Sequence, residues 1–343
     1  MEGSRKKMKP RFLEVTCLVV TWLIIGILPT PAHSQEPVRI RYGVTTSLLH
    51  LPVLVAKESG LFAKYGFDVE VIHIRGGALL TMTIMSGSVQ FSGAGAESVV
   101  AARIEGGEVA LLACPADTDA VYFVARPEIK SAAALKGKAS AVTRLGSTTH
   151  FYLRTALRQS GLDPEKDMTI LQLGAGGEIA AALQSGRIAA AALPFRDTFP
   201  FVQMGWPVLV DLSTSDFFYP SSCVASSRAF IKNNPAAVER FLKAYIEAIR
   251  LIKKDNVFAE RVIRKWHRET DPLFIRKTVE VYARLFKPIP YVPDKGLEVV
   301  LRELSLRRPV PKEFLNRPEY FRDHGPLEKL DKEGWIDQLY KAS

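Results

Sequence analysis

The sequence predicts an α/β protein with two similar lobes, and three features of the chain carry this prediction. Segments with the alternating polar and apolar pattern of strands are separated by segments with helical spacing over residues 38–193. A similar layout of glycine and serine residues occurs at 76–89 and again at 176–188. The chain has 343 residues, of which 47% are hydrophobic, so it is long enough to bury two cores. Strands that alternate with helices in this way favour a largely parallel sheet.

The N-terminal segment, residues 1–34, has the layout of a secretory signal peptide. An uncharged, mostly apolar run over 15–28 follows a basic stretch, and Ala32 and Ser34 suit a cleavage before Gln35. The run is short for a membrane span, which needs about 20 apolar residues, and an uncleaved anchor is the alternative. Both alternatives export the rest of the chain, so we expect a periplasmic or otherwise extracytoplasmic protein. The basic residues are Arg5, Lys6, Lys7, Lys9 and Arg11.

Hydrophobic patterns and turn residues predict the individual elements of the two lobes. Strands are expected over 38–44, 68–74, 89–92, 109–114 and 121–125, with helices over 52–65, 76–86 and 97–104. Further strands are expected over 139–143, 169–173, 188–193 and 219–226, with helices over 146–159 and 174–185. The repeated Gly-Gly…Ser-Gly pieces indicate that both lobes contain similar βαβ units. The alternative is that these glycines only mark ordinary helix ends.

From Asn234 onward the chain is predicted to be helical. Asn234 suits an N-cap and Pro235 suits the first helical position. Later helical segments are expected near 255–267, 272–286, 294–306 and 327–340. The first of the C-terminal helices is amphipathic, because its apolar residues recur at spacings of three and four: Val238, Phe241, Leu242, Tyr245, Ile246, Ile249 and Ile252.

The charge of the chain is uneven, but it does not indicate nucleic-acid binding. Residues 228–343 carry 25 basic and 17 acidic side chains, whereas residues 35–227 carry 16 and 17. The lysines and arginines of the basic part alternate with acidic residues on helical patterns, so we interpret them as solvated helix faces. Export also argues against a nucleic-acid partner.

Glycines and hydroxyl side chains gather where predicted strands end and helices begin. In open α/β sheets ligands bind beyond the carboxyl ends of the strands, and a helix N-terminus offers N–H groups to an anion. Serine and threonine are also ordinary N-caps, so one such loop is ambiguous, whereas several together indicate a cleft. His50 and His150 each follow one of these loops and are either ligand contacts or solvated side chains. The loops are 45–47, 93–97, 146–149 and 174–177.

The same loops lack the motifs of nucleotide binding and catalysis. The runs that begin at Gly93 and Gly174 place Ser98 and Ile179 at the third glycine position of a dinucleotide fingerprint, and no P-loop sequence is present. There is no nucleophile elbow, no zinc-protease helix motif and no metal-ligand spacing among the six histidines. We therefore expect no catalytic residues, no cofactor and no metal.

Five stretches of the chain resemble a known family. They are YGVTT at 42–46, LPVLVAKESGLFAKYGFDVEV at 51–71, SGSVQF at 86–91, LKGKA at 135–139 and GSTTHFYLRTAL at 146–157. Together they resemble the nitrate/sulfonate/taurine and thiamine-pyrimidine-precursor family of periplasmic solute-binding proteins, which serve ATP-binding-cassette (ABC) importers. The resemblance extends over about residues 38–250.

This resemblance implies a type II periplasmic binding protein fold. Its two lobes are mixed sheets flanked by helices, joined by a two-strand hinge, and the C-terminal segment is helical. After the signal peptide at 1–34, lobe 1 would comprise residues 35–125 plus 220–343, and lobe 2 would comprise residues 126–219.

The loops and the resemblance together give a set of expected ligand contacts. In place of the Trp or acidic residue that many family members carry after the strand at 188–193, this chain has Phe195 as an aromatic wall. Beside it, Arg196 either reaches an anion or faces solvent. The expected contacts are Thr45, Thr46, Ser47, His50, Gly76, Gly77, Gly95, Ala96, Glu97, Gly146, Ser147, Thr148, Thr149, Gly176, Gly177 and Phe195.

The function implied by the resemblance is that of an extracytoplasmic solute-binding component of an ABC importer. The solute would be small and anionic or heteroaromatic, such as a sulfonate, nitrate, taurine or a pyrimidine. The partners would be a membrane permease and an ATPase, and the protein itself would be a monomer. Two alternatives are a ligand-binding subunit of a sensory system and a biosynthetic enzyme for a pyrimidine precursor. The enzyme is disfavoured because its cysteine-rich motif is absent.

Two cysteines, Cys114 and Cys223, remain after export. The family topology would bring their strands near each other, and an oxidising compartment permits a bridge. Adjacent strands often hold two thiols in poor geometry for a disulfide. We therefore expect both cysteines to remain free thiols.

Overall fold

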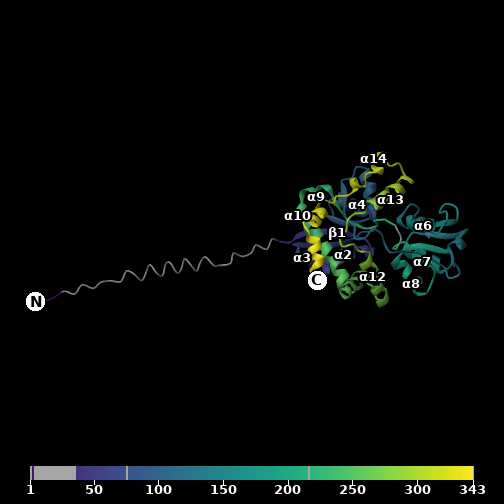
Figure 1. Cartoon of the computed structure of the whole chain (residues 1–343), viewed down its shortest axis with the longest axis horizontal. Helices are drawn as coiled ribbons and strands as arrows, with labels where there is room; N and C mark the ends of the chain where they lie inside the picture. The colour runs from purple at the N-terminus through teal and green to yellow at the C-terminus, as the bar shows by residue number, and fades with distance from the viewer. Residues whose placement is uncertain (1, 4–35, 75, 215–216, 343) are drawn as a thin grey trace. The chain divides into compact units, whose positions relative to one another are not determined.

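Two five-stranded sheets, each flanked by helices, form the two lobes of the protein (Figure 1). The computed structural model describes residues 2–3, 36–74, 76–214 and 217–342. The predicted signal peptide at 1–34 lies outside the described residues, except for residues 2 and 3. No helix within the described ranges is long and apolar enough to cross a bilayer.

The two sheets share one strand arrangement. In the first sheet β1 is parallel to β2 and β3, whereas β10 is antiparallel to β3 and β4. In the second sheet β6 is parallel to β7 and β8, whereas β5 is antiparallel to β8 and β9. The first sheet runs in the spatial order β2 (Phe67–His73), β1 (Val38–Val44), β3 (Phe91–Ala94), β10 (Cys223–Ser227) and β4 (Val109–Ala113). The second runs β7 (Met168–Gln172), β6 (Lys138–Val142), β8 (Ala190–Pro194), β5 (Val121–Ala125) and β9 (Val208–Asp211).

The repeated Gly-Gly…Ser-Gly pieces occupy equivalent places in the two sheets. The first piece contains α4 (Gly77–Met85), which connects β2 to β3, and the second contains α7 (Gly176–Gln184), which connects β7 to β8. In each case the helix crosses from one edge strand to the third strand of its sheet. The shared layout therefore reflects two copies of one βαβ frame.

Two crossovers join the lobes: all five strands of the second sheet lie between them, and the first sheet receives β10 after the second crossover. The first crossover runs from β4 to β5 and the second runs from β9 to β10. Because β5 pairs with β8 and β9, the first passage between the sheets lies before Val121 and not after Ala125. The predicted mixed sheets, two-strand connection and helical C-terminal part are all present.

A disulfide bond joins Cys114 to Cys223, so the expectation of free thiols was wrong. Val224 pairs with Ala113 in the antiparallel ladder, which puts the two cysteines opposite each other at its end. The N–H of Cys114 donates to the carbonyl of Pro290 instead of to the neighbouring strand. Without that hydrogen bond across the pair, the strands approach closely, with the two Cα atoms 4.2 Å apart. This register cannot be read from the spacing of the cysteines along the chain.

Helices cover both sheets, but the first lobe has many more of them (Figure 1). The second lobe contains α6 (Thr148–Gln159), α7 and α8 (Phe195–Gln203). The N-terminal part of the first lobe contains α2 (Leu51–Glu58), α3 (Leu61–Lys64), α4 and α5 (Ala96–Ile104). The C-terminal part adds α9 (Arg228–Asn233), α10 (Pro235–Lys254), α11 (Asn256–His267), α12 (Pro272–Leu285), α13 (Asp294–Ser305), α14 (Lys312–Leu315), α15 (Gly325–Lys332) and α16 (Trp335–Lys341).

Helix α10 confirms the predicted amphipathic pattern. All seven apolar residues of that pattern are buried. Among them, Phe241 stacks on Phe91 of β3 with ring centroids 4.1 Å apart, and it also contacts Phe62 and Tyr42. The helix therefore anchors the C-terminal segment to the first sheet through its apolar face.

Two predicted helices are interrupted, and two elements were not expected. The helix predicted over 52–65 breaks at Gly60, whose φ of 75° is left-handed, and the one over 327–340 breaks at Gly334 in the same way. Helix α8 and strand β9, which follow the second repeat, were not predicted from the sequence. Pro200 lies inside α8, which weakens the helical pattern there.

Candidate functional site

Two cavities meet at Thr45, at the carboxyl ends of the strands. We call them the first and second chambers. The first has a volume of about 450 Å³ and is lined by Thr45, Gly77, Ala78, Leu80, Gly93, Gly95, Glu97, Ser98, Ala101, Arg144, Leu145, Gly146, Ser147, Thr148, Ser221, Ser222 and Arg307. The second has about 550 Å³ and is lined by Thr45, Thr46, Ser47, Leu48, His73, Asp119, Gly176, Gly177, Pro194, Arg196, Asp197, Trp266, His267, Arg268 and Tyr282. Both chambers combine residues of the two lobes.

Three helices begin at the first chamber. They are α4 and α5 of the first lobe and α6 of the second. In the first turn of α6, the N–H groups of Thr148 and Thr149 have no acceptor among the described residues. The same holds for the N–H groups of Gly77 and Ala78 at the start of α4. Each helix start carries a partial positive charge, so the chamber favours an anion.

Glycines allow the backbones to approach closely at these helix starts. A Cβ atom on Gly95 would lie 2.9 Å from the carbonyl oxygen of Ser221 in the second crossover. Gly146 has a φ of 78°, and a Cβ atom there would lie 3.0 Å from Cδ of Arg307. A side chain at either position would therefore move the wall of the chamber or strain the backbone.

Arg307 closes one wall of the first chamber and connects the lobes. Its guanidinium donates to the carbonyl of Gly146 in the second lobe and lies 3.0 Å from Oε1 of Glu97 in the first. The other oxygen of Glu97 accepts a hydrogen bond from the hydroxyl of Tyr219, at 2.7 Å. Tyr219 in turn stacks on Phe151 of α6 with centroids 4.4 Å apart. This network holds the start of α6 against the first lobe.

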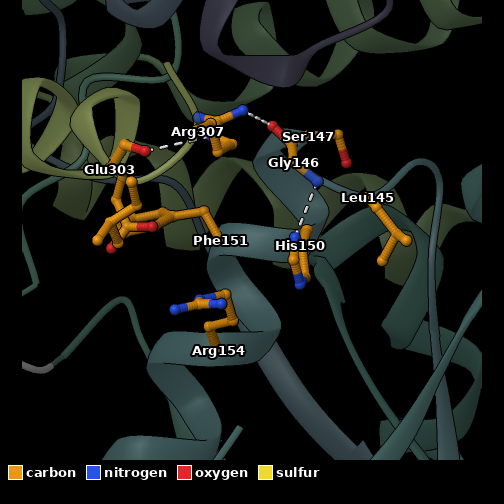
Figure 2. Close-up of a pocket in the computed structure, with 9 residues that line it drawn as sticks. Leu145, Gly146, Ser147, His150, Phe151, Arg154, Glu303 and Arg307 are labelled. Atoms are coloured by element: carbon orange, nitrogen blue, oxygen red, sulfur yellow. Dashed lines mark hydrogen bonds between the residues drawn. The ribbon is translucent and has the colours of Figure 1, made fainter. Parts of the chain in front are cut away.

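An outer pocket lies on the other side of Arg307. Figure 2 shows Arg307 between Glu303 and Gly146, with His150 and Arg154 further along α6. The pocket has a volume of about 310 Å³ and shares Leu145, Gly146, Ser147 and Arg307 with the first chamber. Nδ1 of His150 accepts the N–H of Gly146 at 2.8 Å, so this histidine fixes the loop before α6. Burial lowers the pKa of His150, which favours the neutral ring.

The hydroxyl groups before α6 bond mainly to one another. The hydroxyl oxygens of Thr143, Ser147 and Thr149 lie 2.9–3.0 Å apart, and Oγ1 of Thr149 also accepts the N–H of Thr143. The hydroxyl of Thr148 interacts with Tyr219. These side chains therefore shape the loop, and the free donors at this helix start are backbone N–H groups.

The second chamber is bordered by the loop after β1, the start of α7 and residues near the end of α11. The N–H groups of Gly176 and Gly177 have no acceptor among the described residues and open into this chamber. Arg196 is exposed, lines the chamber and lies 3.3 Å from Nδ1 of His267. It therefore lines the chamber and is also exposed to solvent, and its contact with an anion stays a prediction. Burial lowers the pKa of His267 to about 4, so its ring is neutral near pH 7.

A buried carboxyl group lies among the lining residues of the second chamber. Oδ1 of Asp119, in the first crossover, accepts the N–H of Ala120 at 2.8 Å and the hydroxyl of Tyr282 at 2.7 Å. Burial raises the pKa of Asp119 to about 6. The chamber therefore contains a carboxyl group that titrates near neutrality and is charged at pH 7.

Most expected contacts line one of the two chambers, and five do not. The eleven that line a chamber are Thr45, Thr46, Ser47, Gly77, Gly95, Glu97, Gly146, Ser147, Thr148, Gly176 and Gly177. The five that line neither are His50, Gly76, Ala96, Thr149 and Phe195.

His50 and Phe195 are buried side chains that support the chamber walls. Nε2 of His50 accepts the N–H of Thr45 at 3.0 Å, and its Nδ1 lies 3.3 Å from the hydroxyl of Ser222. Burial lowers the pKa of His50 to about 3, so the ring is neutral. Phe195 packs between Tyr122 and Phe274 inside the core. Ala96 is also buried, and its N–H donates to the carbonyl of Pro220.

Several lining residues had no signal in the sequence. Asp119 and Ser222 lie in the crossovers, whereas Trp266, Tyr282 and Arg307 come from C-terminal helices or their ends. In the sequence these residues resemble ordinary turn residues or solvated and apolar helix positions. Only the tertiary structure brings them to the strand ends.

The comparisons with known proteins agree with this architecture. Residues 48–256 match the family described as NMT1/THI5 like. YtlA, a candidate binding protein of Bacillus subtilis (strain 168), is 24% identical over 280 residues, covering 78% of this chain and 83% of YtlA. A candidate binding protein of Brucella abortus (strain 2308) is 28% identical over 239 residues, covering 66% of this chain and 70% of that protein.

Two solved structures have the same fold. The periplasmic aliphatic sulphonate binding protein SsuA from Escherichia coli superimposes with a TM-score of 0.67 at 21% identity, covering 82% of this chain and 91% of SsuA. The periplasmic nitrate-binding protein NrtA from Synechocystis PCC 6803 gives a TM-score of 0.67 at 14% identity, covering 89% of this chain and 91% of NrtA. The chain therefore belongs to the NMT1/THI5-like family and has the fold of periplasmic solute-binding proteins.

Proposed function

We propose that this protein is the extracytoplasmic solute-binding component of an ABC importer and captures a small anionic or heteroaromatic solute in the two chambers. It would act as a monomer and deliver the solute to a membrane permease that an ATPase drives. The residues that would contact the solute are those of the strand-end loops that line the chambers, together with Arg144, Arg196 and Arg307. The expected signal peptide would place the protein outside the cytoplasm.

The observation that carries this proposal is the convergence of helix N-termini on the chambers. The starts of α4, α5 and α6 border the first chamber, and the start of α7 borders the second. Arg144 is exposed at the first chamber and forms no ion pair with a described residue. Free N–H groups and an unpaired guanidinium are the donors that a small oxyanion or a ring carbonyl requires.

The names of the structural neighbours point to the same ligand chemistry. SsuA is named for aliphatic sulphonates and NrtA for nitrate, which are both small oxyanions. This chain shares their fold, and its chambers lie at the carboxyl ends of its strands, where ligands bind in open α/β sheets. The loops of this chain would therefore serve the same class of solute, with its own side chains setting the selectivity.

A thermal-shift screen of the exported chain, beginning at Gln35, tests the proposal. The compounds are nitrate, linear alkanesulfonates, taurine and substituted pyrimidines. A solute present at about 100 times its Kd should stabilise the folded state by about 2.7 kcal/mol, which corresponds to several degrees in the melting temperature. A shift only with a sugar or with a cation that lacks an anionic group would contradict the proposal.

Two variants at the start of α6 test whether this loop contacts the solute. Gly146→Leu should reduce affinity strongly, because Gly146 has a positive φ and lies against Arg307. Thr148→Ala removes a hydroxyl but leaves the backbone donors, so we expect a loss of roughly 1–2 kcal/mol. Calorimetric titration with the best compound measures both, and circular dichroism checks the fold. If folded Gly146→Leu binds as tightly as the parent, this loop does not contact the solute.

Transport is tested separately in cells of the source organism. Deletion of the gene should abolish uptake of the radiolabelled compound, and the parent chain should restore it. Folded Gly146→Leu should fail to restore uptake. Normal uptake in the deletion strain, despite tight binding in vitro, would assign the protein to a sensory role instead of import.

A further inference from the structure

The second chamber contains a carboxylate oxygen to which no residue described by the structure donates a hydrogen bond. Asp119 is only 6% exposed. Its Oδ1 accepts two hydrogen bonds, one from the N–H of Ala120 and one from the hydroxyl of Tyr282. Its Oδ2 has no hydrogen-bond partner among the described residues, although Asp119 lines the chamber. The oxygen is accessible from the chamber, so a solute that displaces water from it must supply a donor of its own.

No cation of the protein compensates this carboxylate. Arg196 and Arg268 line the same chamber, but no lysine, arginine or histidine of the described chain lies within ion-pair distance of Asp119. Arg196 instead approaches His267. Asp197, the other carboxylate of the chamber, also forms no ion pair with a described residue, and burial raises its pKa. When a solute fills the chamber and displaces water from Asp119, the donor to this carboxylate must therefore come from the solute.

The first chamber supplies the opposite chemistry. Helix starts and Arg144 there favour the negative end of a solute, and Thr45 borders both chambers. A solute that spans Thr45 would present its anionic or acceptor end to the first chamber and its other end to Asp119. The first chamber thus favours an acceptor group of the solute, whereas the second offers the carboxylates Asp119 and Asp197 beside its own cationic side chains, Arg196 and Arg268.

We propose that Asp119 is the specificity-determining residue of the site and that it selects solutes carrying a nitrogen donor, either an ammonium group or an aromatic amino group, over otherwise identical solutes without one. This inference rests on the proposed function, because it assumes that the solute binds in these chambers. The nitrogen N–H would donate to Oδ2, while Tyr282 and Ala120 hold the carboxylate in place through Oδ1. Only a donor completes the hydrogen bonding of Asp119, and a methyl group at the same place would leave the oxygen unpaired.

Matched ligand pairs test the inference. Each pair differs by one nitrogen group replaced with a methyl group: 2-aminoethanesulfonate with 1-propanesulfonate, 3-aminopropanesulfonate with 1-butanesulfonate, and 4-amino-2-methylpyrimidine with 2,4-dimethylpyrimidine. Isothermal titration calorimetry on the exported, oxidised chain gives the Kd ratio of each pair. The parent protein should prefer the nitrogen-bearing member of at least one pair by roughly 10- to 100-fold, the usual range for a hydrogen bond to a charged group.

Substitutions then locate the origin of the preference. In Asp119→Asn the ratio should fall to within about twofold, because the amide offers a donor where the solute requires an acceptor. Affinity for the methyl-bearing member should be unchanged or higher. Asp197→Asn removes the other carboxylate of the same chamber and should keep the parent ratio. Asp119→Ala provides a second test if the asparagine variant does not fold, and circular dichroism checks each variant.

The outcomes separate the inference from the proposed function. Equal binding of both members of every pair by the parent overturns the role of Asp119 and leaves the proposed function standing. An unchanged ratio in folded Asp119→Asn, or a ratio lost only in Asp197→Asn, also overturns it. If no compound of any pair binds at millimolar concentration, and nitrate does not bind either, the anionic or heteroaromatic solute class itself is wrong.

Discussion

The two lobes have the same strand order but differ in what surrounds their sheets. Helices α6, α7 and α8 cover the second sheet, whereas the first carries eight more helices that follow β10 in the described chain. Both frames supply helix starts to the chambers, but only the C-terminal helices and their ends supply Tyr282, Trp266 and Arg307. The arrangement of strands and helices that both lobes share thus provides backbone N–H groups for an anion. The C-terminal helices, which only the first lobe has, provide individual side chains.

The largest expected loss of stability comes from truncating Phe241, a core side chain on helix α10 of the first lobe. Phe241→Ala removes a fully buried ring between Phe91, Phe62 and Tyr42 and should lower the free energy of unfolding by about 3–5 kcal/mol. Ile179→Ala is the counterpart in the second lobe and should cost about 2–5 kcal/mol. Urea unfolding followed by circular dichroism measures both variants.

The shape of these unfolding curves also tests how independent the lobes are. One buried cluster contains Leu111 and Val109 of the first sheet together with Phe123 and Ala192 of the second. We therefore expect one cooperative transition, shifted as a whole by either substitution. Two transitions, each shifted by only one of the substitutions, would show that the lobes unfold separately.

The next largest loss of stability is expected from removing the disulfide bond between Cys114 and Cys223, which joins the two crossovers. The paired substitution Cys114→Ser and Cys223→Ser opens a loop with a sequence separation of 109. Loss of a disulfide over a loop of this length should destabilise the protein by about 2–5 kcal/mol. Urea unfolding compares the paired variant with the oxidised parent, and thiol titration of the unfolded parent should find no free cysteine from Cys114 or Cys223. Two free thiols per exported chain would contradict the bridge.

A smaller effect should appear as a dependence of stability on pH. The pKa of His50 is about 3 in the folded state and about 6.5 when unfolded. Between these values the unfolded chain binds a proton that the folded chain does not, so stability falls as pH decreases. From pH 6.5 to 5.5 the contribution of His50 is about 1 kcal/mol.

His50→Gln isolates that contribution from those of other groups. Burial also lowers the pKa of His267 and His324 to about 4, which gives the same sign, whereas the raised pKa of Asp119 gives the opposite sign. The difference in unfolding free energy between parent and variant should therefore shrink as pH falls from 6.5 to 5.5. A pH-independent difference would mean that folding does not lower the pKa of His50.

The smallest effect should follow from loosening the contact between the lobes at Arg307. Arg307→Ala removes the donor to the carbonyl of Gly146 and the ion pair with Glu97, which should change stability by no more than about 1 kcal/mol. Hydrogen exchange at Gly146 and Ser147, whose N–H groups are hydrogen-bonded, should nevertheless accelerate. Arg308→Ala is the control, because Arg308 pairs with Glu105 within the first lobe. Equal hydrogen-exchange rates in the two variants would show that Arg307 does not hold the lobes together.

The sequence predicted the frame of the fold well because local patterns determine it. The strand at 38–44 was predicted with the bounds of β1, and the apolar face of α10 was identified residue by residue. Gly77, Gly146 and Gly176 were recognised because each lies where a strand gives way to a helix. Such positions depend only on neighbours in the chain, so a single sequence contains them.

The remaining features depend on pairing between distant segments, which local patterns do not contain. The bridge between Cys114 and Cys223 follows from the register of β4 with β10. His50 was expected to contact the ligand because it follows the loop at 45–47, yet its ring turns inward to Thr45 and Ser222. Asp119 had no motif around it, and both its burial and its hydrogen bond with Tyr282, which is 163 residues away in the chain, arise only from the tertiary structure.

The disulfide bond has one further consequence for the architecture of the chain. Every strand of the second sheet lies between Cys114 and Cys223, whose Cα atoms are only 4.2 Å apart. The second lobe is thus a module inserted into a hairpin of the first, with adjacent entry and exit points. Such a module can be exchanged without changing the path of its host chain, provided that the replacement fills the buried cluster that the two sheets share. A lobe from another family member could be grafted between the two cysteines, so that half of the binding site changes in a single step while the host sheet keeps its register.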